Sequence, residues 1–181
     1  MNIVSITDSL GESAGGLSNA TFNLAISTAA HLPHDNLTIL SSKDDLEVDS
    51  QVVLPSNCRV VKQGCYRNPI YPLAPALYKR LIDLNPDLLH LRGLWRQASS
   101  VALKWKKNYP RKKLIVQAAG MLEPWARKRN SILKRIRYAL VEMQLFQLCD
   151  AIHATSRQEA EHLIALGMDH EKTVIIEEGI F

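Results

Sequence analysis

The sequence predicts an α/β fold, a three-layer arrangement in which helices cover both faces of a parallel sheet of about seven strands. Short apolar runs, typical of buried parallel strands, alternate with segments of helical spacing along the chain. The chain has 181 residues, 46% of them hydrophobic, which suffices for one core. We therefore expect a single Rossmann-like domain over residues 1–181.

The N-terminal half of the chain supplies the first predicted strands, which are Met1–Thr7, Asn36–Leu40 and Cys58–Gln63. A helix over Ser18–Ala30, for which Ser18 is the expected cap, connects the first two strands. A proline-containing loop enters a second helix, Ala76–Leu84. This helix ends before Pro86 because the residue that precedes a proline disfavours helix.

The C-terminal half supplies the remaining predicted strands, which are Asp87–Leu91, Leu114–Ala118, Ala151–Ala154 and Thr173–Ile176. One helix begins near Gln97. A longer helix over Arg129–Leu148 should bury its apolar face, formed by Ile132, Ile136, Leu140 and Met143. After the sixth strand, Ser156 and Glu159 predict a capping box in which they satisfy each other's N–H groups, and Gly167 ends that helix.

The stretch between the first strand and the first helix, Asp8–Asn23 (DSLGESAGGLSNATFN), is the leading candidate for a binding loop. In an open parallel sheet, ligands bind at the carboxyl ends of the strands, where this loop lies. Gly15 and Gly16 would let a ligand approach the backbone, and the free N–H groups of the helix start favour phosphate or another anion. The alternative is a tight turn, but a turn needs fewer than two adjacent glycines.

Two later strand ends also carry candidate binding residues. Arg92 lies at the carboxyl end of the fourth strand, where binding groups collect, whereas His90 within that strand is expected to be a core imidazole. The fifth strand leads into Ala119–Arg129 (AGMLEPWARKR), whose glycine, acid, proline and tryptophan are typical of a functional loop. For Trp125, stacking on a flat ligand and packing beneath a helix both stay open.

Basic residues are concentrated in one part of the chain. The segment Arg92–Arg137 contains 14 basic residues and one acid, so its net charge is +13 while the whole chain carries +4. This asymmetry suggests an anionic partner, which could be a phosphorylated ligand, an acidic membrane surface or nucleic acid. For Lys104–Lys113 we favour an ordinary solvated helix face. For Arg127–Arg137 a solvated face and an anion-binding surface stay equally open.

Several classes of protein are not favoured by the sequence. The N-terminus lacks the features of a signal peptide, and no apolar run is long enough to span a bilayer. Cys58, Cys65 and Cys149 have no CxxC spacing, so we expect reduced thiols in a cytoplasm rather than disulfides or a zinc site. The acidic loop Ser42–Asp49 lacks EF-hand spacing and is expected to be a solvated turn. No GxSxG or HExxH motif is present, and we expect neither a metal nor a cofactor in this chain.

Four stretches carry a resemblance to a known family: Gly15–Ser18 (GGLS), Pro86–Trp95 (PDLLHLRGLW), Gly120–Ala126 (GMLEPWA), and Ala154–Ser156 (ATS) with Glu159 and Glu161. With these stretches the chain resembles the N-terminal half of a bacterial GT-B glycosyltransferase of family 4. This is the retaining type that builds lipopolysaccharide and exopolysaccharide. The resemblance covers essentially the whole chain. GMLEPWA is its most specific part and the glycine pair its least specific.

The resemblance implies that two domains bind different substrates. In that family, the N-terminal domain binds the sugar acceptor, and a second Rossmann-like domain binds the nucleotide-sugar donor without requiring a metal. Gly15 and Gly16 would lie against the acceptor and the donor diphosphate. Arg92 and the loop after the fifth strand would frame the pocket for a glycan or lipid-linked sugar, with the loop contributing Gly120, Glu123 and Trp125.

The resemblance also implies a location in the cell. A basic helix in such enzymes often meets the cytoplasmic face of the inner membrane, where a lipid-linked acceptor lies. The residues that fit this role are Arg127, Lys128, Arg129, Lys134 and Arg135. We therefore expect a cytoplasmic protein that contacts the membrane peripherally. Nucleic acid is not an expected partner, because aromatic residues are not interleaved with these charges.

Three positions depart from the family's pattern. Ala119 stands where a histidine or arginine often precedes the Gly-Met-Leu run, and Arg92 replaces the second histidine of the usual His-x-His-Gly strand end. Glu177-Glu178-Gly179 replaces the Pro-Asn-Gly turn that links the two domains, and the sequence ends at Phe181, so we expect the donor-binding domain to be absent.

The expected absence of a donor domain affects the activity that we expect. One half supplies only one wall of the active site, so we expect little or no turnover from this chain alone. Two hypotheses stay open. The chain is either the acceptor-binding half of a glycosyltransferase, or a non-catalytic carbohydrate-binding, anion-binding or scaffold domain derived from one.

Overall fold

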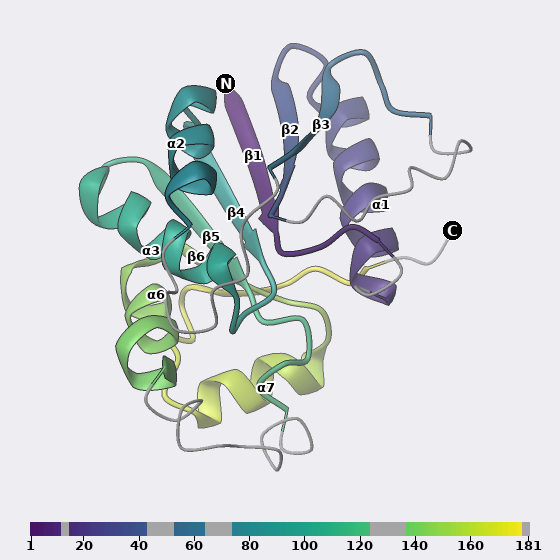
Figure 1. Cartoon of the computed structure of the whole chain (residues 1–181). Helices are drawn as coiled ribbons and strands as arrows, with labels where there is room; N and C mark the ends of the chain where they lie inside the picture. Colours follow the sequence, from purple (N-terminus) through teal and green to yellow (C-terminus); the bar gives the residue numbers. More distant parts are fainter. Residues whose placement is uncertain (12–14, 43–52, 64–73, 124–136, 179–181) are drawn as a thin grey trace.

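The computed structural model describes residues 1–11, 15–42, 53–63, 74–123 and 137–178. These residues form one sheet of seven strands in the order β3-β2-β1-β4-β5-β6-β7, and every neighbouring pair of strands is parallel (Figure 1). The predicted fold class is confirmed.

The strands agree closely with the apolar runs of the sequence. Their bounds are β1 Asn2–Thr7, β2 Asn36–Ser41, β3 Cys58–Lys62, β4 Leu88–Arg92, β5 Lys113–Gln117, β6 Ala151–Ala154 and β7 Thr173–Ile175. In register, Thr7 pairs with Arg92 and Arg92 pairs with Gln117. Because register partners point to the same face of a sheet, these three polar side chains share one face at the carboxyl ends of their strands.

The helices cover both faces, as predicted. Their bounds are α1 Gly16–His31, α2 Pro75–Leu84, α3 Gln97–Asn108, a π-helical turn η2 Tyr138–Glu142, α6 Met143–Leu148 and α7 Arg157–Ala165. α1 lies on one face of the sheet and α2, α3 and α6 lie on the other (Figure 1). α7 packs against β6 and β7.

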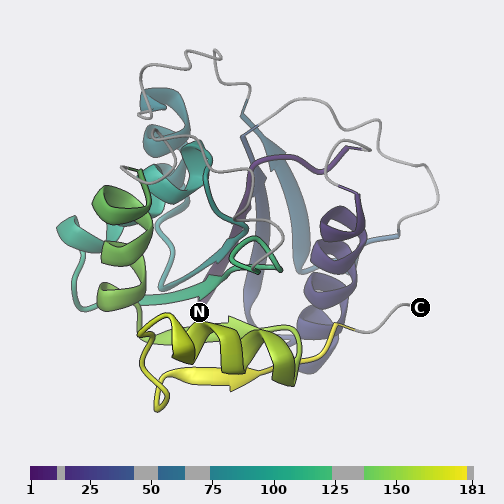
Figure 2. The same ribbon diagram turned by 90° about the horizontal axis from the view of Figure 1, so that it is seen from below.

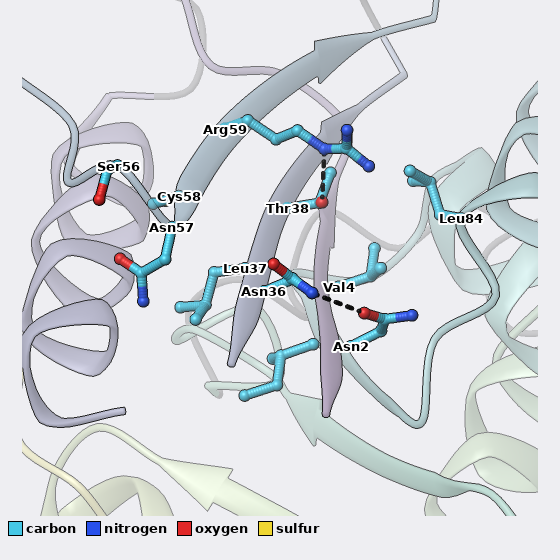
Figure 3. A pocket seen from close by; sticks show the side chains of 11 residues that line it. Asn2, Val4, Asn36, Leu37, Thr38, Ser56, Asn57, Cys58, Arg59 and Leu84 are labelled. Carbon is cyan, nitrogen blue, oxygen red and sulfur yellow. Dashed lines mark hydrogen bonds between the residues drawn. The ribbon is translucent and has the colours of Figure 1, made fainter. Parts of the chain in front are cut away.

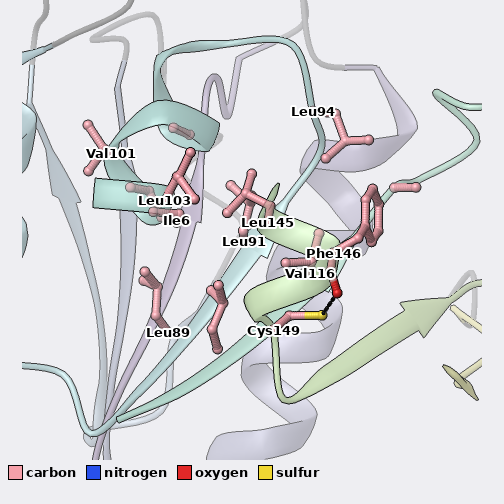
Figure 4. Close-up of a cluster of buried hydrophobic side chains, with 14 of the residues drawn as sticks. Ile6, Leu89, Leu91, Leu94, Val101, Leu103, Val116, Leu145, Phe146 and Cys149 are labelled. Carbon is pink, nitrogen blue, oxygen red and sulfur yellow. Dashed lines mark hydrogen bonds between the residues drawn. The ribbon is translucent and has the colours of Figure 1, made fainter. Parts of the chain in front are cut away.

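Two apolar clusters hold these layers together. The larger cluster joins the sheet to α2, α3, α6 and α7, and it includes Leu89 and Leu91 of β4 with Leu145 and Phe146 of α6 (Figure 4). The smaller cluster joins α1 to β2 and β3 through residues such as Phe22 and Ile39. Burial of each such side chain contributes about 1.5 to 3 kcal/mol, so these clusters supply the main driving force for the fold.

The start of α1 differs from the prediction. The helix begins at Gly16, its N-cap is Gly15, and no side chain caps it. Ser18, the expected cap, lies inside the helix and donates its hydroxyl to the carbonyl of Leu10. The short loop before the helix is therefore tied to the helix by a side chain from its first turn.

The predicted apolar face of the helix before β6 is wrong at one position. Leu140 is 60% exposed, although simple helical spacing placed it in the core. The η2 turn explains this error, because Leu140 lies within it and a π-helical turn holds more residues than the α-helical turn that the spacing assumed. Ile132 and Ile136 lie outside the described residues.

The expectation of a solvated face over Lys104–Lys113 is wrong for Lys106. This side chain is only 6% exposed, and its Nζ lies 2.7 Å from Asp150 Oδ2. Burial acts to raise the pKa of Asp150, but the hydrogen bonds from Lys106, the Leu114 backbone and Lys113 outweigh it and lower that pKa to about 2. Lys106 therefore links α3 to the start of β6.

Candidate functional site

The strand order reverses between β1 and β4, so the chain leaves these neighbours toward opposite faces of the sheet. Figure 2 shows α1, in dark purple, on one side of the sheet and the teal and green helices on the other. In open α/β sheets, ligands bind at such a point, outside the carboxyl ends of the strands. We call residues 8–11, 15–17, 93–96 and 118–123 the switch-point loops.

Gly93 joins three of the switch-point loops. A Cβ at this position would lie 3.1 Å from Cε of Met121 and 3.2 Å from Cδ2 of Leu17. The next residue, Leu94, donates its backbone N–H to the Met121 sulfur at 3.1 Å. The absence of a side chain at Gly93 therefore lets the loops after β4 and β5 pack against the first turn of α1.

Left-handed backbone is concentrated in the switch-point loops. The residues there with positive φ are Gly15 (56°), Gly93 (81°), Trp95 (69°), Ala119 (51°) and Gly120 (72°). This conformation costs energy for Trp95 and Ala119, because both carry a Cβ. Strained residues of this kind cluster at functional sites, which favours these loops as the site.

Gly15 and Gly16 form the start of α1 at the switch point. Among the described residues, nothing lies within 4 Å of a Cβ built at either glycine. The N–H groups of the first turn have no side-chain cap and lie at the positive end of the helix dipole. The geometry is suited to an anion, and contact of these glycines with a ligand stays a prediction.

Arg92, the predicted cationic binding residue, is paired inside the protein. Its side chain is 1% exposed and its Nη2 donates to Glu178 Oε1, which also accepts from Gln117 Nε2 at 2.7 Å. Burial lowers the pKa of Arg92, and the Glu178 carboxylate opposes this shift. Arg92 thus anchors the segment after β7 to the end of β4, and a direct contact with a ligand stays a prediction.

His90 is a buried imidazole, as expected, and it pairs with a second histidine. Nδ1 of His153 lies 3.3 Å from Nε2 of His90, and Nε2 of His153 lies 2.9 Å from the carbonyl of Ile176. Since the carbonyl only accepts, Nε2 of His153 carries its proton and Nδ1 accepts from His90. Burial lowers the pKa of both imidazoles, so the pair is neutral.

The loop after β5 is held by Glu159 of α7. Glu159 Oε1 accepts the backbone N–H of Gly120 at 2.6 Å, and Oε2 accepts the N–H and the hydroxyl of Thr155, both at 2.7 Å. The predicted capping box is therefore half right. Ser156 does accept the N–H of Glu159, at 3.1 Å, but the Glu159 carboxylate bonds to Thr155 and Gly120 instead of Ser156.

Glu123, the predicted acid of the site, is also paired within the protein. Its Oε2 lies 2.6 Å from Nδ1 of His162 in α7, and its side chain is mostly buried. Glu123 and Gly120 are thus both fastened to α7. The loop after β5 is fixed at two points, and a direct contact between Glu123 and a substrate stays a prediction.

Arg96 differs from Arg92 in being open to solvent. Its side chain is 59% exposed, and its Nε lies 3.9 Å from Oδ2 of Asp8, whose Oδ1 accepts the hydroxyl of Ser42 at 2.8 Å. An exposed ion pair of this length is weak and leaves the guanidinium accessible. In the sequence, Arg96 stood out only as part of the basic segment Arg92–Arg137.

Several predicted residues lie outside the described residues. These are Trp125 and the basic surface of Arg127, Lys128, Arg129, Lys134 and Arg135. Among the residues that the structure describes, no group of three His, Cys, Asp or Glu side chains could hold a metal ion. None of the described helices is both long enough and apolar enough to cross a membrane.

A pocket of about 340 Å³ lies at the amino ends of the strands, opposite the switch-point loops, around the first residues of β1, β2 and β3 (Figure 3). Its polar side chains bond to one another: Arg59 Nε donates to Thr38 Oγ1 at 3.2 Å, and Asn36 Nδ2 donates to Asn2 Oδ1 at 3.3 Å. Because ligands of open α/β sheets bind at the carboxyl edge, we assign the site to the switch-point loops.

The contacts that assemble the site were not predicted from the sequence. Leu94 and Met121 are 27 positions apart, and Glu123 and His162 are 39 positions apart. No local pattern marks such pairs. The left-handed residues Gly93 and Trp95 follow a strand end, and that position is the one signal that could have pointed to them.

A family model described as Glycosyltransferase Family 4 matches residues 14–180. The chain belongs to Glycosyltransferase Family 4. The family predicted from the four sequence stretches is confirmed, and the chain is glycosyltransferase-like. No curated protein matches this Family 4 chain.

Solved structures show the same fold as this Family 4 chain. The Anabaena protein Alr3699/HepE, solved with UDP and glucose, has a TM-score of 0.68 at 18% identity and aligns with 99% of this chain and 45% of its own. The UDP-GlcNAc 2-epimerase from Neisseria meningitidis has a TM-score of 0.60 at 13% identity, with 98% and 47% covered. A glycosyltransferase from Rickettsia africae has a TM-score of 0.56 at 19% identity, with 99% and 43% covered.

Each alignment matches the Family 4 chain to one part of a longer protein. The chain has the fold of the N-terminal half of a GT-B protein. It spans less than half the length of the structures that it matches. At these identities the structural match establishes the fold alone.

Proposed function

We propose that this chain is the acceptor-binding half of a retaining glycosyltransferase of lipopolysaccharide or exopolysaccharide biosynthesis. The complete enzyme would transfer a sugar from a nucleotide-sugar to a glycan or lipid-linked acceptor. The observation that carries the proposal is the Family 4 match over residues 14–180. Structures with the same fold were solved with UDP, with UDP-glucose and with UDP-GlcNAc, which supports a nucleotide-sugar as the donor.

In this proposal the acceptor binds at the switch-point loops. Gly15 and Gly16 let it approach the backbone at the start of α1, and Arg96 supplies an accessible cation for a phosphate or carboxylate of the acceptor. Arg92 and Glu123 act differently from Arg96. Arg92 is already paired with the Glu178 carboxylate, and Glu123 already contacts the His162 ring, so both hold the loops in place around the acceptor.

The described residues supply one wall of an active site. Transfer requires that the donor diphosphate be neutralised and that the anomeric carbon be held against the acceptor hydroxyl. We assign the donor to a second Rossmann-like domain, in cis or in trans, and expect little turnover without it. The basic residues between Arg127 and Arg135 would then contact the anionic cytoplasmic face of the inner membrane.

Calorimetric titration tests the acceptor site. The chain is titrated with lipopolysaccharide core oligosaccharides and with polyprenyl-diphosphate-linked sugars in detergent micelles. We expect one of these probes to bind, and both Arg96→Ala and Gly16→Trp to weaken its affinity about ten-fold or more. The control Arg80→Ala replaces an exposed arginine of α2 and should leave the affinity unchanged. Equal binding by all four proteins would overturn the assignment of the site.

A non-catalytic binding or scaffold domain is the second candidate function. Two predicted charged residues, Arg92 and Glu123, already have side-chain partners inside the protein, which favours this candidate. It predicts that the chain binds a glycan but that an added donor-binding domain restores no transfer from any UDP-sugar. Transfer in that reconstitution would support the enzyme instead.

A further inference from the structure

The loop between β4 and α3 is contacted by a buried acid from a distant part of the chain. Glu142 has a fully buried side chain, and its Oε1 accepts the backbone N–H of Trp95 at 3.1 Å, although the two residues are 47 positions apart. The same oxygen lies 3.3 Å from Nε of Arg137. Burial of a carboxylate is costly unless partners compensate for lost hydration. Glu142 therefore contributes through its polar contacts and not through apolar packing.

Two neighbours of Glu142 contact the same loop. Arg137 donates through Nη2 to the carbonyl of Arg96 and to the hydroxyl of Ser100, the latter at 3.1 Å. The ring of Tyr138 lies beside the indole of Trp95, with 5.8 Å between the ring centroids. Side chains from one short helical segment therefore hold both the backbone and the side chain of this loop.

The π-helical turn makes this arrangement possible. Arg137 and Glu142 are five positions apart, and in an α-helix that spacing would turn their side chains about 140° away from each other. In η2 the N–H of Met143 bonds to the carbonyl of Tyr138, which is the i→i+5 pattern of a π-helix. This widened turn brings residues five apart to nearly the same side, so Arg137 and Glu142 face the loop together.

The contacted loop includes a strained residue and the accessible cation. Trp95 has a φ of 69°, which is unfavourable for a bulky side chain and persists only where surrounding contacts hold it. Arg96 follows directly and is 59% exposed beside Asp8. The direction of the Arg96 side chain therefore depends on the conformation that is imposed at Trp95.

We infer that Glu142 is a positioning residue of the acceptor site. With Arg137 and Tyr138 it holds Trp95 in the left-handed conformation and thereby directs the Arg96 side chain toward Asp8. The effect on acceptor affinity rests on the proposed function, whereas the effect on the loop does not. The two can therefore be tested separately.

Hydrogen exchange measured by NMR tests the effect on the loop. Glu142→Leu removes the acceptor of the Trp95 N–H, and we expect the Trp95 amide to exchange about ten-fold faster or more. Glu142→Gln keeps a carbonyl oxygen and should restore protection. The amide of Ile39 in β2 reports the intact fold, and Glu161→Leu, at an exposed position of α7, is the control. Unchanged exchange at Trp95 in Glu142→Leu overturns the inference.

A second variant covers the case in which Glu142→Leu does not fold. Arg137→Met keeps Glu142 but removes the bonds to Arg96 and Ser100, and it should also accelerate exchange at Trp95. Calorimetry with the probe that binds the wild-type chain then tests function, and Glu142→Gln should recover the affinity that Glu142→Leu loses. If exchange follows this pattern while no probe binds the wild-type chain, the positioning role stands and the proposed function fails.

Discussion

Arg92, the last residue of β4, and Glu178, three residues beyond β7, form an ion pair that joins the switch point to the end of the described chain. The arginine is buried and the carboxylate is shared with Gln117. The pair therefore determines where the segment after β7 crosses the sheet.

Removal of the arginine should be strongly destabilising. In Arg92→Met the Glu178 carboxylate loses its cationic partner and keeps only the Gln117 amide, and we expect the free energy of unfolding to fall by about 3 kcal/mol. Urea denaturation measures this loss, and Arg80→Met on the exposed face of α2 serves as the control. The loss should shrink when Glu178→Gln is already present. An equal loss in both backgrounds would show that the ion pair is not its cause.

The Glu159 carboxylate should contribute far more to the free energy of unfolding than the Glu161 carboxylate, which also lies on α7. Glu159→Ala leaves the N–H groups of Gly120 and Thr155 without an acceptor, so we expect a loss of about 2 kcal/mol or more in the free energy of unfolding. Glu161→Ala removes only an exposed pair with Arg157 and should change it by about 0.5 kcal/mol or less. Thermal unfolding of both variants provides the comparison, and similar melting temperatures would contradict the role of Glu159.

Two glycines with left-handed backbone allow strain and crowding to be separated. Among the described residues, no atom lies within 4 Å of a Cβ added at Gly167, so Gly167→Ala should cost only the conformational penalty of about 1 kcal/mol. Gly93→Ala also crowds Met121 and Leu17, so we expect about 1 kcal/mol more and a weaker affinity for the acceptor probe. Addition of Met121→Ala should relieve part of the crowding. A cost at Gly93 no larger than that at Gly167 would show that the loops are not in tight contact.

The His90 and His153 pair should make stability depend on pH. The pKa of each imidazole is lowered from its ordinary value of 6.5, chiefly by burial, so below about pH 6.5 the unfolded chain binds more protons than the folded protein. The stabilising contribution is therefore complete above about pH 6.5 and is lost as the pH falls toward the lowered pKa values.

Urea denaturation at a series of pH values measures this dependence. His90→Gln keeps a donor for Nδ1 of His153 but removes one titrating group. We expect the free energy of unfolding of this variant to decline less steeply than that of the wild type between about pH 7 and pH 5. Parallel profiles for the two proteins would contradict the buried, neutral pair.

The strands were predictable because the local sequence of a buried parallel strand is a short apolar run. LIVQA and AIHA, for example, fall within one residue of β5 and coincide with β6. The helix before β6 was harder, because its π-helical turn moves Leu140 to the surface and no residue type marks such a turn.

The candidate site was predictable in place but not in detail. The strand ends and the glycines near them indicated the loops at the carboxyl ends of the strands, because ligands of open α/β sheets bind there. Whether an arginine is free or paired depends on distant residues. Arg92 is neutralised by Glu178, 86 positions away, while Arg96 stays accessible, and the local sequence does not distinguish the two.

The most direct test of the acceptor site is a map of backbone amide shifts in the ¹⁵N-labelled chain during titration with lipopolysaccharide core oligosaccharides. We expect the largest shift changes at residues 15–17, 93–96 and 118–123, with the same residues unaffected in Arg96→Ala. Shift changes confined to the pocket around Asn2, Asn36 and Arg59 would place the ligand at the opposite edge of the sheet and contradict the proposed site.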